Sequence, residues 1–170
     1  MNGAAVTGGL ELALACDFLV ASDRATFADT HARIGVMPGW GLTVALPEAV
    51  GLRRAREMSA TGNFISARTA LAWGLVNHVV AHDELLGFSR RLAADVSSAD
   101  PGALLEILAT YRKGALVAGR EARQVEARAH RRFHARGIDA ELVASRRDAV
   151  IERGRVLSSR GLRGPGLVCE

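Results

Sequence analysis

The chain has 170 residues, of which 49% are hydrophobic and 24% are charged, and its formal net charge is +4. This composition excludes a disordered chain and predicts one soluble domain with a single core. Glu11 and Asp17 interrupt the apolar opening stretch and no basic segment precedes it, so we expect neither a transmembrane helix nor a signal peptide, and we expect a cytoplasmic protein. Cys16 and Cys169 lie in no metal-ligand or disulfide-framework spacing, so no metal site is predicted.

The first part of the chain predicts short elements in alternation. Apolar spacing and chain-breaking residues predict a helix over 8–16, a strand over 18–22, a second strand over 25–28 and a loop over 29–41. An α/β domain follows from this order.

The next part is mostly helical. Helices are expected over 43–51 and 52–62, and Gly62 is a plausible stop for the second. A helix is then expected from Ser66, as N-cap, to Gly74, with a strand over 75–80.

The C-terminal part shows helical spacing as well, at Leu104, Ile107, Leu108, Tyr111 and Ala115. Two rows of residues seven apart, Leu142/Ala149/Val156 and Val143/Val150/Leu157, are predicted to form one apolar stripe. The stripe is expected to pack against its own domain or to be buried in a subunit interface. The end, 158–170, is glycine-rich and aperiodic, and is predicted to be a mobile tail.

Basic residues are unevenly distributed, with eight in the first hundred positions and fourteen from Arg112 onward. Acidic residues alternate with these arginines, which favours a solvated helix face. A nucleic-acid surface or a site for a polyphosphorylated small molecule is the alternative.

The opening turn predicts an anion pocket. Thr7, Gly8 and Gly9 stand between a strand and a helix, where free N–H groups and the helix dipole favour an oxyanion. Glycine lets a ligand oxygen approach the amide closely. An ordinary capped helix, with Thr7 as N-cap, is the simpler alternative, but a capping box would place the acid at Leu10, and Glu11 is one residue late.

Two segments carry a resemblance to a known family: NGAAVTGGLELALACDFLVASDRATFA and GVMPGWGLTVALPEAVGLRRAREMSATGNFISARTALAWGLVNHVV. They resemble the crotonase (enoyl-CoA hydratase/isomerase) superfamily in their Gly-rich turn, Glu-Leu-Ala run, Pro-Gly loop and Gly-Leu-Val-Asn segment. The likeness is strong over 2–85 and weaker to about 157.

The resemblance implies an α/β crotonase-like fold, with a core of ββα repeats that is incomplete here, followed by a helical oligomerisation region. On this basis 1–100 is expected to be the C-terminal part of the core and 101–157 the trimerisation region. The family's first half, which supplies the other oxyanion N–H and much of the coenzyme A pocket, is expected to be missing. A homotrimer, or a hexamer of two trimers, is implied.

The resemblance also implies a reaction. A coenzyme A thioester is the substrate, with no separate cofactor, and its oxygen is held by two backbone N–H groups, one matching Gly8. Glu11 matches the first of two catalytic glutamates, which in hydratases hold a water and move protons during its addition to a 2-enoyl-CoA.

His31 stands where the family has its second catalytic glutamate. A histidine can give or take a proton near neutral pH, so it could replace that glutamate, or it could be a loop residue bonded to a neighbour. A carboxylate is what the family's isomerases use there, so hydration is favoured over isomerisation.

Pro38, Gly39 and Trp40 fall in the loop that borders the acyl pocket in the family. Trp40 is expected to be a packing anchor or to shape the acyl end. The leading hypothesis is therefore a hydratase that binds neither nucleic acid nor membrane. The alternatives are another crotonase-family enzyme (isomerase, decarboxylase or thioester hydrolase), an inactive acyl-CoA-binding subunit, and a nucleic-acid-binding protein.

Overall fold

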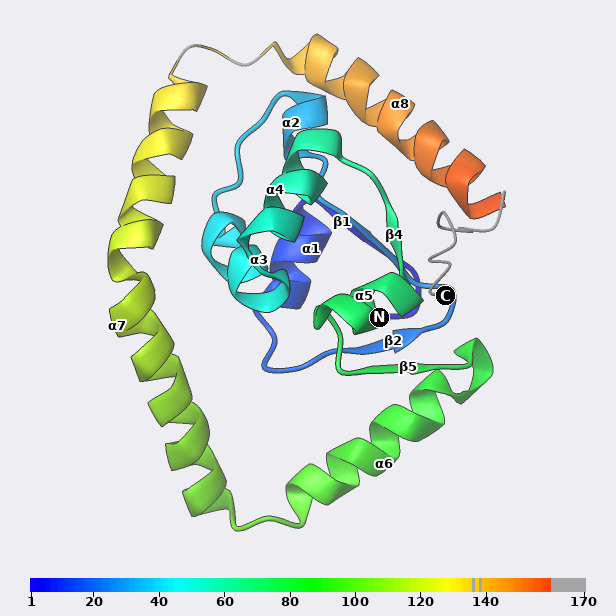
Figure 1. Ribbon diagram of the computed structural model, residues 1–170, viewed down its shortest axis with the longest axis vertical. Helices are drawn as coiled ribbons and strands as arrows, with labels where there is room; N and C mark the ends of the chain where they lie inside the picture. Colours follow the sequence, from blue (N-terminus) through cyan, green and yellow to red (C-terminus); the bar gives the residue numbers. More distant parts are fainter. Residues whose placement is uncertain (136, 138, 160–170) are drawn as a thin grey trace, which may run out of the picture.

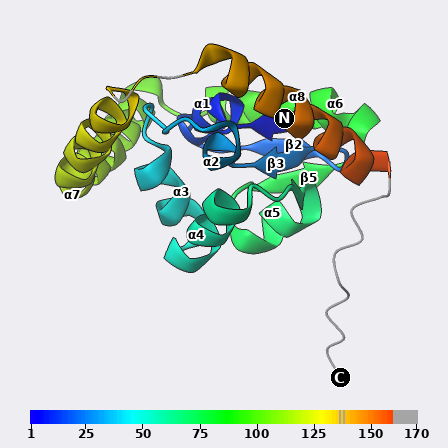
Figure 2. The same ribbon diagram turned by 90° about the horizontal axis from the view of Figure 1, so that it is seen from above.

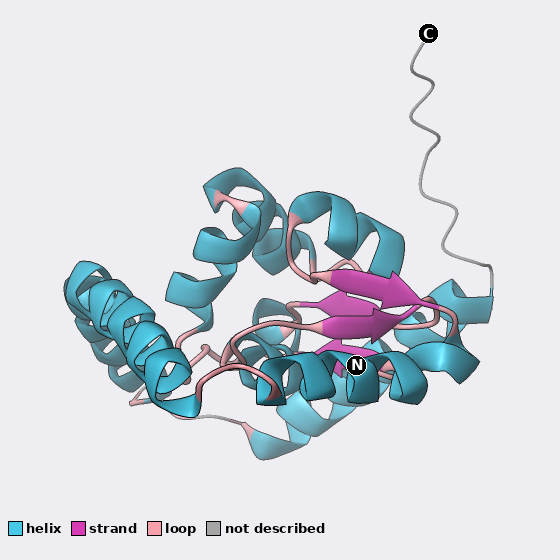
Figure 3. Ribbon diagram, turned by 90° about the horizontal axis from the view of Figure 1, so that it is seen from below, coloured by secondary structure: helices cyan, strands magenta, loops and turns pink. Residues whose placement is uncertain are grey.

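The computed structural model describes residues 1–135, 137 and 139–159. The mixed α/β fold is rich in helix, and its strands gather at the centre with helices around them (Figure 3). The strands are β1 (Ala4–Val6), β2 (Val20–Ser22), β3 (Thr26–Ala28), β4 (Ile65–Ser66) and β5 (His78–Val80). The helices of the core are α1 (Gly8–Leu14), α2 (His31–Ile34), α3 (Leu42–Val50), α4 (Leu52–Thr61) and α5 (Ala67–Trp73).

A short 3₁₀ turn, η1 (His82–Glu84), leads into three longer helices: α6 (Leu85–Ser97), α7 (Pro101–His134) and α8 (Ala140–Ser159). These three run around the outside of the core (Figure 1). None of the helices in the described part of the chain is both long and apolar enough to span a bilayer.

The strands form two small sheets. In the first, β1 pairs with β3 in parallel and β3 pairs with β4 in antiparallel; in the second, β2 and β5 are parallel. The register of the first sheet sets Val6 opposite Ala28. Because the two strands are parallel, the segments that follow them leave the sheet at the same edge. The helices α1 and α2 therefore both begin beside this edge.

The core lies between these strands and the helices α1, α3, α4 and α5, and its largest buried side chains are Phe27, Leu10, Leu42, Leu46 and Met58. Seen from above, α8 lies on one side of the strands, and α4 and α5 lie on the other (Figure 2).

Several helix ends lie where the local sequence predicted them. The Ser66 hydroxyl accepts a hydrogen bond from the Thr69 N–H at 3.1 Å, so Ser66 is the N-cap of α5 as predicted. Gly62 ends α4 at a φ of 56° and Gly74 ends α5 at 83°. At these left-handed positions glycine avoids the steric cost of a Cβ.

Other boundaries were wrong. The loop expected over 29–41 contains α2, the helix expected over 8–16 ends at Leu14, and the strand expected over 18–22 starts only at Val20. The tail expected over 158–170 overlaps α8, which continues to Ser159, and residues 160–170 lie outside the described residues.

The two rows of α8 do not form one buried stripe. Val150 is buried and Val143 is half-buried, whereas Leu142 is 44% exposed and Ala149 is exposed. The helix as a whole packs on α2. The difference arises because neighbours in sequence lie about 100° apart around a helix, so that only one row faces the domain.

Candidate functional site

The turn after β1 has a backbone conformation unusual for its residue. Thr7 has φ 54° and ψ −117°, and it is the only residue other than glycine with a positive φ in the described part of the chain. Its N–H donates to the Ala28 carbonyl at 3.1 Å, and its hydroxyl hydrogen-bonds to the Thr30 hydroxyl at 2.5 Å. Thr7 occupies the N-cap position of α1, but its side chain makes no capping bond, so the simple capped helix is not what forms.

The same turn leaves donors at the start of α1. The first backbone bonds of the helix are made by Leu10, at 3.0 Å, and Glu11, at 3.1 Å, both to the Thr7 carbonyl. The N–H groups of Gly8 and Gly9 precede them in the chain. Groups at this position have no intrahelical partner and can bind an oxyanion.

Glu11 lies in the first turn of α1, and it is buried, with 5% of its surface exposed. One carboxylate oxygen, Oε1, accepts a hydrogen bond from the Trp40 backbone N–H at 2.9 Å. The other, Oε2, lies 3.5 Å from Nε2 of His31. The carboxylate is therefore held on one side by the Pro-Gly loop and faces the histidine on the other.

His31 is the first residue of α2 and is as buried as Glu11. Its Nδ1 lies 2.7 Å from Oδ1 of Asp29, and its backbone N–H donates to the same oxygen at 3.2 Å. The second oxygen, Oδ2, accepts from the Ser59 hydroxyl of α4 at 2.5 Å. That Glu11 and His31 lie together was implied only by the family resemblance. Asp29 was missed, although it stands two residues before His31.

Asp29 remains a carboxylate in this setting. Burial raises its pKa, but hydrogen bonds from His31 and Ser59 and the charge of the His31 ring lower it more, and the net pKa lies below the ordinary value. A line of three groups, Asp29, His31 and Glu11, thus crosses from the end of β3 to α1.

The loop before α3 is held by α7. Oxygens of the buried Glu126 accept from the N–H of Gly41 at 2.8 Å, the N–H of Thr43 at 2.8 Å and the Thr43 hydroxyl. The ring of His130 donates from Nδ1 toward the carbonyls of Met37 and Pro38, at 3.2 and 3.1 Å. The positions of Glu126 and His130 in the sequence gave no sign of these contacts, because both lie more than eighty residues from their partners.

Trp40 is 71% exposed, so it is not a buried packing anchor. Its six-membered ring lies over Gly8, and a Cβ at Gly8 would stand 3.3 Å from Cζ3. Gly39 is packed against α7 instead, since a Cβ there would lie 2.9 Å from the His130 ring.

A cleft of about 360 Å³ opens beside Glu11, between α1, α3 and α7. It is lined by Glu11, Leu14, Ala15, Trp40, Gly41, Ala45, Glu48, Arg112, Ala115 and Arg123. Of the predicted site residues, Glu11 and Trp40 line it, His31 lies behind Glu11, and Pro38 and Gly39 are not among the described residues that form its wall. Trp40 thus stands between the Gly8 turn and the cleft.

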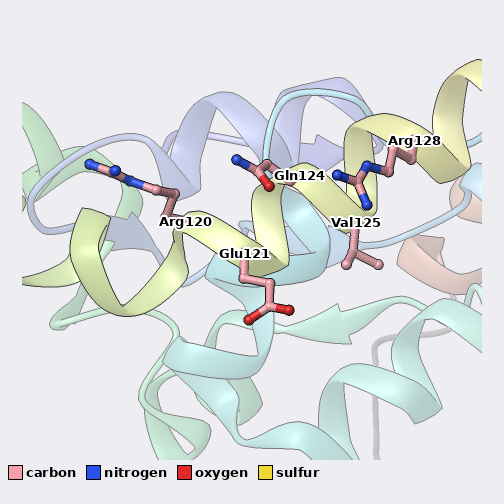
Figure 4. A pocket seen from close by; sticks show the side chains of 5 residues that line it. All are labelled: Arg120, Glu121, Gln124, Val125 and Arg128. Atoms are coloured by element: carbon pink, nitrogen blue, oxygen red, sulfur yellow. The ribbon is translucent and has the colours of Figure 1, made fainter.

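A second hollow lies on the outer face of α7 and is lined by Arg120, Glu121, Gln124, Val125 and Arg128 (Figure 4). All five residues come from one helix, so this is a shallow surface and not a cavity between elements. Its mixed charges fit a solvated helix face.

Comparison with known proteins finds relatives named as an enoyl-CoA hydratase and a carnitinyl-CoA dehydratase. A probable peroxisomal enoyl-CoA hydratase 1 of Arabidopsis thaliana is 45% identical over 114 residues, which are 67% of this chain and 43% of that protein. A carnitinyl-CoA dehydratase of Salmonella agona is 40% identical over 112 residues, again 43% of its length. The chain therefore spans less than half the length of the curated relatives it matches.

The similar solved structures include enoyl-CoA hydratases. The enoyl-CoA hydratase of Mycobacterium tuberculosis H37Rv superposes with a TM-score of 0.79 at 50% identity, covering 81% of this chain and 62% of that one. The enoyl-CoA hydratase of Mycobacterium smegmatis gives a TM-score of 0.78 at 51% identity, covering 79% and 62%. A family model described as enoyl-CoA hydratase/isomerase matches residues 1–142, and the chain belongs to that family.

Proposed function

We propose that a protein containing this chain adds water to the double bond of a 2-enoyl-CoA thioester. The observation that carries the proposal is the buried pair of Glu11 and His31, whose facing atoms are 3.5 Å apart beside the Gly8 turn. Two adjacent proton-carrying groups next to free N–H donors are what a hydration at a thioester requires. The names of the relatives agree with an acyl-CoA substrate.

Gly8 is assigned to the thioester oxygen. As the nucleophile adds to the β-carbon, negative charge moves to that oxygen and forms an enolate, which an aimed backbone N–H stabilises. The absence of a side chain at Gly8 keeps the approach open, and the ring of Trp40 borders it on one side. The second donor is expected from the part of the family's length that this chain does not span.

Glu11 and His31 are assigned to the two proton transfers. The step needs one group of the pair to carry a proton and the other to lack one, and the facing atoms Oε2 and Nε2 can each do either. The group without that proton takes one from water while the water oxygen bonds to the β-carbon. The protonated group gives its proton to the α-carbon, and the pair again holds one proton at the end.

The acyl group is assigned to the cleft beside Glu11, with Trp40 at its border. Pro38 and Gly39 contribute by shaping the loop that presents Trp40. No resident cofactor is part of this proposal, because the coenzyme A thioester is itself the substrate.

The assembly is assigned by family resemblance to a homotrimer or a hexamer of two trimers. The half-exposed Leu142 and the exposed apolar residues Ile107 and Tyr111 of α7 support a helical interface in this region.

The test is a Glu11→Gln substitution in a protein that carries the family's first half together with this chain. Loss of the enoyl absorbance of crotonyl-CoA measures hydration. The rate should fall by roughly 10²–10⁴-fold with binding largely unchanged, because a positioned acid–base group contributes that much. Glu57→Gln, at an exposed position of α4, is the matched control and should leave the rate unchanged. Normal hydration by Glu11→Gln would remove the carboxylate from the mechanism and end the proposal.

A further inference from the structure

We propose that Asp29 is a positioning residue that holds His31 with Nε2 turned toward Glu11. This inference rests on the proposed function for its catalytic meaning, but its structural content concerns the orientation and protonation of one ring. Asp29 itself does not face the cleft; it acts through His31.

The contacts of Asp29 fix it at both oxygens. Oδ1 receives both the backbone N–H and Nδ1 of His31, at 3.2 and 2.7 Å, so the carboxylate holds the residue at two points. Oδ2 receives the Ser59 hydroxyl at 2.5 Å. Because Asp29 is only 2% exposed, water does not compete for these oxygens, and α4 anchors the carboxylate that anchors the histidine.

The arrangement selects one form of the imidazole ring. A carboxylate can only accept, so the proton of the 2.7 Å contact sits on Nδ1 and the ring presents Nε2 to Glu11. A neutral ring protonated at Nε2 would instead set the lone pair of Nδ1 against the Asp29 carboxylate. The carboxylate also stabilises the ring when Nε2 takes a proton, since opposite charges then lie in contact.

This role differs from simple support of the fold. A buried carboxylate that only ties α2 to α4 would affect stability and leave the tautomer of His31 unchanged. An orienting carboxylate sets where the proton of the ring resides, as a carboxylate that accepts from the free ring N–H of a metal-binding histidine does.

The first experiment uses the 170-residue chain and needs no activity. Long-range ¹⁵N–¹H NMR correlations report which nitrogen of His31 is protonated. In the wild type, Nδ1 should carry a proton at every pH at which the chain is folded. In Asp29→Asn, the fraction protonated at Nε2 alone should rise to at least half. Ser59→Ala, which leaves the carboxylate in place, should shift this fraction less.

The second experiment uses a protein with the family's first half restored. Asp29→Asn should lower kcat by about 10- to 100-fold and change KM less than about twofold, because the binding surface is intact. Asp95→Asn, at an exposed position of α6, is the control and should change neither.

The outcomes separate the two proposals. A wild-type His31 protonated only at Nε2 overturns the assignment of Asp29, even if Asp29→Asn does not fold. A wild-type kcat retained in Asp29→Asn overturns it as well. An enzyme that hydrates no enoyl-CoA overturns the proposed function, while the NMR result still decides whether Asp29 orients the ring.

Discussion

The attachment of α7 to the Pro-Gly loop should depend on the side chain of Glu126. The perturbation is Glu126→Gln, which keeps the shape of the side chain but removes its charge and replaces one oxygen with a donor NH₂ group. Glu126 accepts from Gly41 and Thr43 at the start of α3, where the helix dipole also favours a negative charge. After the substitution one of these N–H groups faces another donor.

The magnitude follows from those contacts. A hydrogen bond to a charged group contributes about 1.5–3 kcal/mol, and the Gln variant loses at least one of the three that Glu126 accepts. The free energy of local opening between α7 and the loop should fall by that amount. At 1.36 kcal/mol per factor of ten, the open population rises roughly 10- to 150-fold.

Native-state hydrogen exchange measures this opening directly, because the affected donors are the amides of Gly41 and Thr43. Their exchange rates should rise by the same factor in Glu126→Gln. The matched control is Glu121→Gln, on the outer face of the same helix (Figure 4), which should change the rates little. Wild-type exchange at Gly41 and Thr43 in Glu126→Gln would show that the carboxylate does not hold the loop, and the reasoning would be refuted.

Gly8, Asp29 and the two rows of α8 can each be tested by substitution. Gly8→Ala should displace the Trp40 ring, because the new Cβ would stand 3.3 Å from it, and an unmoved Trp40 indole N–H resonance would contradict this. The pKa of Asp29 lies below its ordinary value, because its hydrogen bonds outweigh the effect of burial. Its ionised form therefore stabilises the fold above pH about 4, and this stabilisation is lost as the pH falls through the lowered pKa. The urea midpoint should therefore fall more on acidification in wild type than in Asp29→Asn; equal falls would contradict it. Val150→Asp should unfold the chain by burying a charge, whereas Leu142→Asp should leave it folded. In a protein that also carries the family's first half, Leu142→Asp should yield smaller species by light scattering if the proposed trimer forms. Two equally stable variants would show that the rows are wrongly assigned.

The sequence predicted features that depend on neighbours along the chain. The cap at Ser66 and the stops at Gly62 and Gly74 each depend on contacts within a few residues, and all three were placed correctly. Glu11 was singled out by the Gly-Gly turn before it, whereas His31 was singled out only because it stands where the family has its second catalytic glutamate. Their 3.5 Å separation depends on strand pairing and was implied only by the family resemblance.

The contacts that the sequence did not predict depend on packing between residues far apart in the chain. Glu126 and His130 meet the Pro-Gly loop only because α7 folds back along the core, and no local pattern distinguishes them from the other polar residues of an arginine-rich helix. Which of the two rows of α8 is buried, the Leu142 row or the Val143 row, likewise depends on which side of the helix faces the domain. α2 itself is a single turn of four residues, too short for periodicity to reveal.

Because β1 pairs with β3, the distance between Glu11 and His31 is set by how many residues follow the paired positions on each strand. Val6 lies opposite Ala28, Glu11 follows Val6 by five positions, and His31 follows Ala28 by three. A one-residue insertion or deletion in either short connection would rotate one of the two side chains away while leaving the sheet intact. Length variation among homologous chains should therefore be absent from 6–11 and 28–31, and should concentrate in segments such as 15–19, which connect elements without setting this distance.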